Sequence, residues 1–107
     1  MQISKFYFFI LLIVTFSSNT ALADGINCQS IGETAKLVMW HRQNGTAISR
    51  IMGVVDRSAD SDLRKLMKAI VVEAYETPFY SSQLNKEEII SEFGNKIEVI
   101  CIKSSLE

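Results

Sequence analysis

The chain has 107 residues, of which 48% are hydrophobic, and its 11 basic and 12 acidic side chains give a formal net charge of −1. This length fits one domain. Without a basic excess, the composition argues against nucleic-acid binding, which depends on clustered lysine and arginine. No cationic amphipathic segment indicates binding to a membrane surface.

Residues 1–23 have the composition of a secretory signal peptide. Lys5 supplies a positive charge, an apolar run follows from Phe6 to Phe16 (FYFFILLIVTF), and a small-x-small sequence (ALA) ends at Ala23. We therefore predict cleavage between Ala23 and Asp24. The alternative is an uncleaved membrane anchor, although the apolar run is shorter than the roughly 20 residues of a membrane span.

The expected mature domain is residues 24–107. Its net charge is −2, because the only basic residue of the signal leaves with it. Export predicts a periplasmic or secreted location. No stable membrane insertion is expected after cleavage, since no later stretch approaches the length of a membrane span.

Two cysteines remain, Cys28 and Cys101, near the two ends of the mature chain. An exported protein meets an oxidising compartment, so we expect them to form a disulfide. Closing the loop from residue 28 to residue 101 is worth roughly 4.5 kcal/mol in the loop-entropy model. The alternative, a zinc site, is poorly supported, because the chain has only one histidine and no closely spaced cysteine pair.

The first helix is expected from Cys28 to about Asn44. Gly45 accepts the left-handed backbone conformation that ends many helices, so Asn44-Gly45 marks the C-terminus. The helical spacing places one apolar face toward the core, with Ile31, Ala35, Val38 and Met39.

A shorter second helix is expected after Thr46, whose hydroxyl can cap the first turn. The polar run from Asp56 to Asp62 (DRSADSD) then predicts a loop. The apolar stripe of this helix consists of Ile48, Ile51, Met52 and Val55.

The third helix should begin at a cap supplied by Asp60 or Ser61 and run to about Glu76. It ends there because the residue before Pro78 avoids helical backbone angles. Its expected buried stripe consists of Leu63, Leu66, Met67, Ile70, Val71 and Ala74.

The last segment, residues 86–103, has two interpretations. Ile97 to Ile102 (IEVICI) is rich in β-branched side chains and favours a strand. A strand would bury apolar side chains on both faces and would lack a partner strand, so we favour a helix, capped by Asn85 with Glu88 at capping-box spacing. Gly94 is a weak point of this helix. Its apolar face carries Ile89, Ile90, Phe93, Ile97, Ile100 and Cys101.

These elements predict an all-α fold, a small four-helix domain tied by one disulfide. The cysteines lie at the start of the first helix and the end of the last, so they meet if those helices run antiparallel.

Residues 39–45 (MWHRQNG) contain the only tryptophan and the only histidine of the chain. On a helix Trp40, His41 and Arg42 point in three directions, so they cannot converge on one small substrate. Trp40 and Leu37 lie opposite the apolar face and are the expected contact surface for a partner protein. The alternative is that another helix covers them.

Arg42 falls on the apolar face, where a buried charge requires a partner. We expect an ion pair with Glu73, or else with Asp56. The alternative is that its stem covers apolar surface while the guanidinium reaches helix carbonyls or water. His41 is the only candidate general base, but the sequence spacing places no serine, cysteine or carboxylate beside it. No cofactor or metal site is expected.

Several of these residues form the layout Cys…RQxG…AYxxP…Cys, which comprises Cys28, Arg42-Gln43, Gly45, Ala74-Tyr75, Pro78 and Cys101. This layout resembles a loose group of small exported proteins of Gram-negative bacteria and their prophages, of unknown function. The resemblance covers nearly all of the mature chain. It implies a bacterial periplasmic setting and a helical fold, and it supplies no catalytic residues.

We expect a non-enzymatic protein that binds another protein, as an inhibitor, immunity factor or envelope accessory does. The alternative is a small cell-envelope hydrolase that uses His41, which requires a carboxylate close to the imidazole in a concave pocket. A chaperone-like role would require an apolar groove near Tyr75 to Tyr80. The sequence defines neither the partner nor the oligomeric state.

Overall fold

The computed structural model describes residues 27–106. The predicted signal peptide (1–23) and the cleavage site at Ala23 and Asp24 lie outside these residues. Four helices account for most of the described chain, and no strand occurs in it: α2 (Cys28–Gln43), α3 (Ile48–Val55), α4 (Ser61–Glu76) and α5 (Gln83–Ser105). The expected all-α fold is confirmed.

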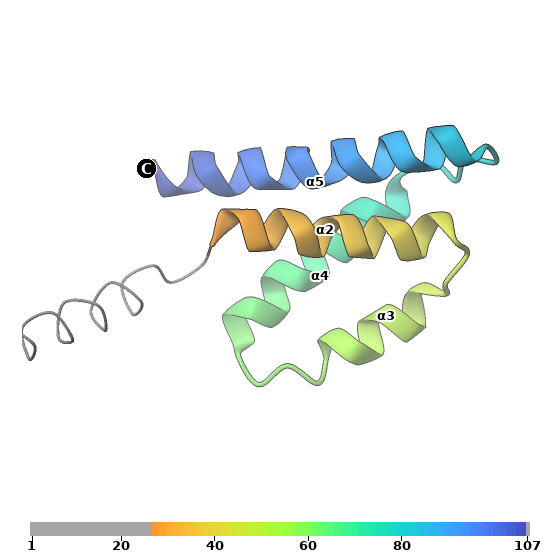
Figure 1. The fold of residues 1–107 in the computed structure, drawn as a ribbon. Helices are drawn as coiled ribbons and strands as arrows, with labels where there is room; N and C mark the ends of the chain where they lie inside the picture. Colours follow the sequence, from red (N-terminus) through yellow and green to blue (C-terminus); the bar gives the residue numbers. More distant parts are fainter. Residues whose placement is uncertain (1–26, 107) are drawn as a thin grey trace, which may run out of the picture.

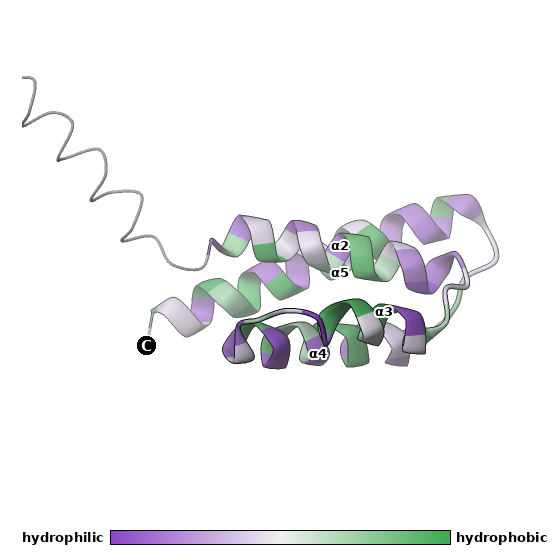
Figure 2. Cartoon of the chain, turned by 90° about the horizontal axis from the view of Figure 1, so that it is seen from below, coloured by the Kyte–Doolittle hydropathy of each residue, from purple (hydrophilic) through white to green (hydrophobic). Residues whose placement is uncertain are grey.

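The helices form two layers (Figure 1). The long helices α2 and α5 run antiparallel, side by side, and make the most extensive contact of the fold. Helices α3 and α4 form a second layer against α2, as the view from below also shows (Figure 2). Helix α4 contacts α2 and α3 and diverges from α5 toward its own N-terminus.

Three of the helix starts are capped by side chains. The Asn27 and Asp60 side-chain oxygens each accept hydrogen bonds from two backbone N–H groups of α2 and α4, as expected at an N-cap. The predicted cap of α5 at Asn85 is wrong. Helix α5 begins at Gln83, because the hydroxyl of Ser82 accepts a hydrogen bond from the Asn85 backbone N–H at 3.2 Å.

The predicted cap of α3 at Thr46 is also wrong. Ala47 occupies the N-cap position and makes no side-chain hydrogen bond there. Thr46 instead shares a hydrogen bond of 3.0 Å between its hydroxyl and the His41 ring. The C-terminus of α2 follows the expectation, because Gly45 has a φ of 79° directly after it.

The core lies where α2, α4 and α5 meet. The α2 face predicted to be buried is confirmed, and α3 contributes one fully buried residue, Val55. The stripe predicted for α4 is buried only in its C-terminal half, since Leu63 remains 38% exposed at the end that diverges from α5. The buried apolar residues are Ile31, Ala35, Val38, Met39, Val55, Ile70, Val71, Ala74, Phe93 and Ile97.

The segment 97–102 is helical, so the alternative of a strand is excluded. Only Ile97 is fully buried there, whereas Val99, Ile100 and Ile102 are each about half exposed. Ile100 was predicted to face the core. This is wrong, because α4 and α5 diverge at this level and leave Ile100 uncovered. The C-terminal half of α5 therefore carries more apolar surface than its neighbours cover.

Two features fix α2 against α5. Cys28 and Cys101 form the predicted disulfide, with Cα atoms 5.5 Å apart. Between the disulfide and the middle of the pair, Gly32 faces Gly94, and a Cβ added at Gly94 would lie 3.0 Å from the Gly32 carbonyl oxygen and against the Lys36 stem. Gly94 was expected to weaken the helix. The helix continues through it, and the missing side chain allows the close approach.

Within residues 27–106, no helix combines the length and the apolar composition needed to cross a bilayer.

Gly94→Ala should lower the free energy of unfolding by about 1–3 kcal/mol, because the added methyl group forces α2 and α5 apart. Gly53→Ala is the matched control. A Cβ there meets nothing within 4 Å, so the same change in α3 should stabilise by about 0.5–1 kcal/mol. Urea denaturation without reductant measures both. Equal effects of the two substitutions would contradict the close contact at Gly94.

Candidate functional site

The end of α2 is fixed to the α4–α5 connection by Gln43, which is fully buried. Its amide nitrogen donates a hydrogen bond of 2.9 Å to the Pro78 carbonyl, and its amide oxygen accepts one of 2.9 Å from the Tyr80 backbone N–H. A buried amide of this kind must have its hydrogen bonds satisfied, and here both ends are. Gln43 therefore has a structural role that the sequence analysis missed.

Arg42 supports the same connection from the next position. Its Nε donates a hydrogen bond of 3.1 Å to the Thr77 carbonyl, and its guanidinium lies over the Tyr75 ring, 5.6 Å from the ring centre. The Tyr75 hydroxyl in turn donates a hydrogen bond of 2.7 Å to the Thr46 carbonyl. These contacts join the C-terminal ends of α2 and α4.

The ion pair expected between Arg42 and Glu73 does not form. Glu73 lies on the other side of α4, where its carboxylate pairs with Lys96 of α5 at 2.8 Å. Asp56, the second expected partner, pairs with Lys68 at 3.1 Å. Arg42 has instead the alternative arrangement, in which a half-buried side chain near a helix end binds a backbone carbonyl, that of Thr77.

Most residues of the RQxG and AYxxP elements thus meet at one place, the junction between the ends of α2 and α4. Arg42 and Gln43 bind the backbone around Pro78, Gly45 ends α2, and Tyr75 binds the turn after it. Their contacts are with one another and with the backbone. The spacing of this layout is therefore explained by packing and hydrogen bonding.

His41 offers little for hydrolysis. Its Nδ1 lies 3.0 Å from the Thr46 hydroxyl, and the Trp40 ring stands edge-on to the imidazole at 5.1 Å. No carboxylate within salt-bridge distance of the ring occurs among the described residues. In the same part of the chain, no three His, Cys, Asp or Glu side chains are grouped so that they could hold a metal ion.

Trp40 and Leu37 lie on the outer face of α2, away from the second layer. Their exposed fractions are 48% and 58%. Beside Trp40 is a shallow recess of about 330 Å³ between α2 and α5, whose rim carries Lys36, Lys86 and Glu87. We call Trp40, Leu37 and this recess the tryptophan face.

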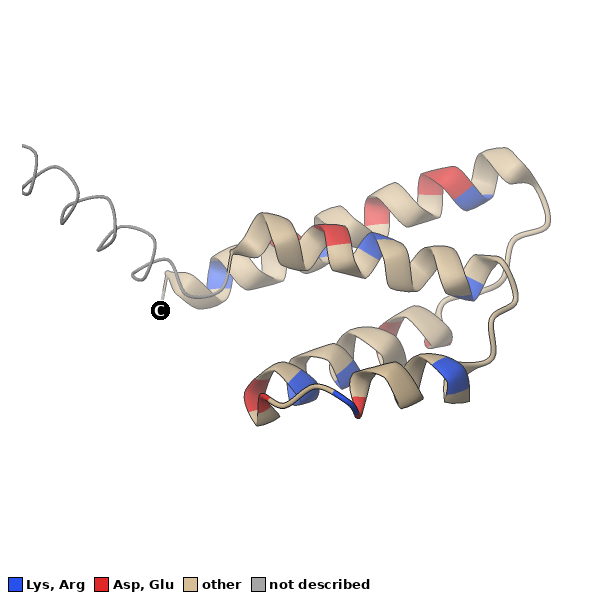
Figure 3. Cartoon of the chain, turned by 60° about the horizontal axis from the view of Figure 1, so that its bottom comes forward, with Lys and Arg blue, Asp and Glu red and all other residues tan. Residues whose placement is uncertain are grey.

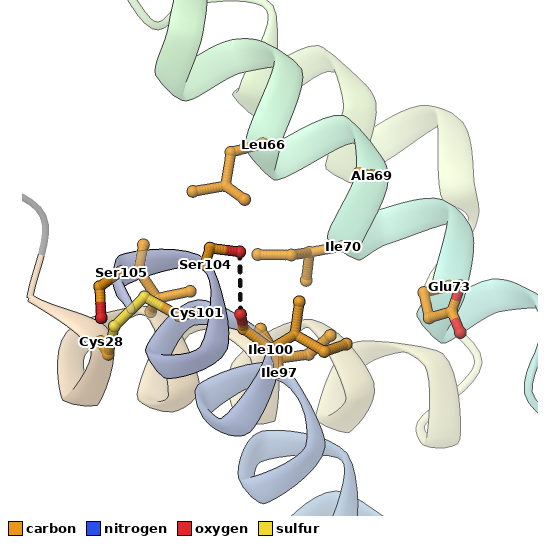
Figure 4. A pocket seen from close by; sticks show the side chains of 11 residues that line it. Cys28, Leu66, Ala69, Ile70, Glu73, Ile97, Ile100, Cys101, Ser104 and Ser105 are labelled. Carbon is orange, nitrogen blue, oxygen red and sulfur yellow. Dashed lines mark hydrogen bonds between the residues drawn. A yellow bond between two sulfur atoms is a disulfide. The ribbon is translucent and has the colours of Figure 1, made fainter. Parts of the chain in front are cut away.

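A larger apolar depression lies along the C-terminal half of α5, where α4 diverges. Its volume is about 530 Å³. Leu66 and Ile70 of α4 point across it toward Ile97 and Ile100 of α5, and the disulfide lies at its end, as Figure 4 shows. We call it the α4–α5 groove.

The groove contains little polar chemistry. Glu73 is its only ionisable lining residue, and it is paired with Lys96. The Ser104 hydroxyl at the other end donates a hydrogen bond of 3.0 Å to the Ile100 carbonyl, marked in Figure 4. Because these polar groups already have partners, the groove is suited to apolar contact rather than to acid–base catalysis.

Helical periodicity alone does not predict this groove. Helical periodicity places Leu66, Ile70, Ile97 and Ile100 on inward faces and cannot show that two such faces diverge. The only signal was the apolar composition of IEVICI, which exceeds what one buried helical face requires.

Replacing Gln43 by Met should lower the free energy of unfolding by about 2–4 kcal/mol. The change keeps the volume similar but leaves the Pro78 carbonyl and the Tyr80 N–H without their partner. Gln29→Met, at an exposed position of the same helix, should change it by less than about 0.5 kcal/mol. Urea unfolding curves compare the two, and similar values would contradict the role assigned to Gln43.

The junction should also make stability depend on high pH. Burial raises the pKa of the Tyr75 phenol above its usual value of 10.0, while the Arg42 guanidinium opposes the rise. The folded chain therefore keeps this proton where the unfolded chain has lost it. The resulting stabilisation is complete below a pH of about 10 and is lost as the pH rises through the higher pKa of the folded state.

Tyr75→Phe should remove this part of the pH dependence and should cost about 1 kcal/mol at neutral pH through the lost hydrogen bond to Thr46. Thermal unfolding of both proteins between pH 7 and pH 11 measures the difference. Identical slopes above pH 10 would contradict a buried, neutral phenol.

Comparison of the chain with protein-family models, with curated proteins and with solved structures gave no match. The function is therefore inferred from the described residues alone. These offer two apolar surfaces, the tryptophan face and the α4–α5 groove, and a junction whose polar side chains are already hydrogen-bonded to the backbone.

Proposed function

We propose that this protein is exported and acts by binding another protein, as an inhibitor, an immunity factor or an envelope accessory does, and that it is not an enzyme. The observation that carries the proposal is an exposed tryptophan beside an exposed leucine, on the outer face of α2. Tryptophan in such a position is a frequent anchor of protein–protein contacts.

The surroundings of Trp40 support a protein partner. Nearby side chains include both signs of charge, with Lys36 and Glu33 paired at 3.3 Å on α2 and with Lys86 and Glu87 at the recess. An apolar centre with a polar rim of both signs is the usual composition of a protein interface. A nucleic-acid site would instead need a basic excess.

The disulfide supports the proposed location. Cys28 and Cys101 are joined, and stable structural disulfides belong to oxidising compartments such as the periplasm or the extracellular space. The location also agrees with the signal peptide predicted at residues 1–23. In this setting a small domain with a covalent clamp can remain folded while one helix face stays available for a partner.

Trp40→Ala should weaken binding of the partner at least tenfold, because the indole supplies the centre of the contact. It should lower the free energy of unfolding by less than about 1 kcal/mol, since half of the side chain is already exposed. The tagged protein, purified without reductant, can be used to capture proteins from a periplasmic extract of the source organism. Partners retained by the wild type and lost with Trp40→Ala are then quantified by mass spectrometry.

Val72→Ala is the control, because Val72 is an apolar side chain of similar exposure (45%) on α4, in the second layer and away from the tryptophan face. It should retain the partner. Unchanged capture by Trp40→Ala would contradict the proposed contact. A loss of about 3–5 kcal/mol of stability would show that Trp40 belongs to the core.

A further inference from the structure

The α4–α5 groove leaves aliphatic side chains exposed to solvent, although the domain is small and its core is limited. Ile100 is 50% exposed on the α5 wall, and the partly buried Leu66 faces it from the α4 wall, beside the buried Ile70. The lining is aliphatic and contains no aromatic ring. Burial of such a surface is favourable by roughly 25 cal/mol for each Å² removed from water.

The two walls of the groove carry opposite net charges. On α4, helical spacing places Asp62, Lys65 and Glu76 on the same side as Glu73. This wall therefore carries three acidic side chains and one basic side chain. Figure 3 shows charges of both signs along this helix.

On the α5 wall, helical spacing places Lys96 and Lys103 one turn to either side of Ile100. No acidic side chain lies between them on that wall. The one acidic residue in this interval, Glu98, is turned toward α2, where its Cβ would lie 3.1 Å from a methyl group added at Gly32. The α4 wall is therefore acidic overall, and the α5 wall is basic.

We propose that two copies of this chain associate face to face through their α4–α5 grooves, about a two-fold axis parallel to the groove. This rotation places the α4 wall of each copy over the α5 wall of the other, so that acidic walls meet basic walls twice. Glu73 of each copy then lies over Lys96 of the other copy. A two-fold axis across the groove would instead place acidic wall on acidic wall, which charge repulsion opposes.

The available area makes this dimer weak. The 16 residues of α4 span about 24 Å, and two neighbouring helices are about 20 Å wide, so the face covers roughly 480 Å² in projection. Stable interfaces bury about 800 Å² on each partner. We therefore expect a weak, transient dimer that forms only at high protein concentration. The tryptophan face lies elsewhere and stays free in the dimer.

The test uses the full-length gene expressed in a Gram-negative host, with the product purified as the host processes it and without reductant. Sedimentation velocity from about 1 μM to 1 mM should show a monomer that becomes a dimer as the concentration rises. Ile100→Glu should raise the dissociation constant at least tenfold, because it places a charge in the apolar centre of the contact.

Ile102→Glu is the matched control. It changes another isoleucine of the same helix, with nearly the same exposure (45%), on the face turned away from the groove. Its dissociation constant should equal that of the wild type. Circular dichroism and thermal unfolding establish that both variants fold, and Ile100→Ala serves in place of Ile100→Glu if the charged variant does not.

A charge exchange tests the orientation. Glu73→Lys should weaken the dimer, because Lys96 of both copies then faces a second positive charge. The double variant Glu73→Lys/Lys96→Glu restores opposite charges within each copy and across the axis, so it should restore the dimer.

Three results would overturn the proposal: a monomer at every concentration, equal effects of Ile100→Glu and Ile102→Glu, or a double variant that remains as weak as Glu73→Lys. A lipid or a second protein that co-purifies in the groove of a monomer would also overturn it. None of these results bears on capture of a partner at Trp40, so the proposed function is tested separately.

Discussion

The antiparallel contact between α2 and α5 is the constraint on which the rest of this structure depends. The Cys28–Cys101 disulfide sets the register of the two helices at one end, and the missing side chains of Gly32 and Gly94 allow them to approach closely further along. A domain of this size buries limited apolar area, so a covalent link between its ends contributes a large share of its stability. Once α2 is held in this way, its remaining faces are available for α3 and α4.

The other end of α2 is fixed by neutral hydrogen bonds. Gln43 binds the backbone on both sides of the α4–α5 connection, and Arg42 binds the carbonyl just before it. Because this junction lies at the C-terminal end of α4, it leaves the N-terminal half of α4 free to diverge from α5. The groove is thus a consequence of where α4 is anchored, and the disulfide at the groove's far end keeps the α5 wall in place.

Helical periodicity predicted the side of α2 on which Trp40 and Leu37 lie, because the angular position of a residue follows from its place in the sequence. The same reasoning placed Arg42 on the inner side correctly but assigned it the wrong partner. Glu73 is near the apolar stripe of α4, yet the crossing of the helices turns it toward Lys96 of α5. Partners that are far apart in the sequence depend on crossing geometry, which periodicity does not contain.

The sequence by itself determined the local features: the helical class, the stop at Gly45, a cap for α4 at Asp60 or Ser61 and the pairing of the only two cysteines. Each of these depends on a few neighbouring residues or, for the disulfide, on the lack of any other partner. The tertiary structure alone decided the role of Gln43, the partners of Arg42 and the opening between α4 and α5. These depend on how whole helices pack, and one crossing angle changes the neighbours of every side chain along the contact.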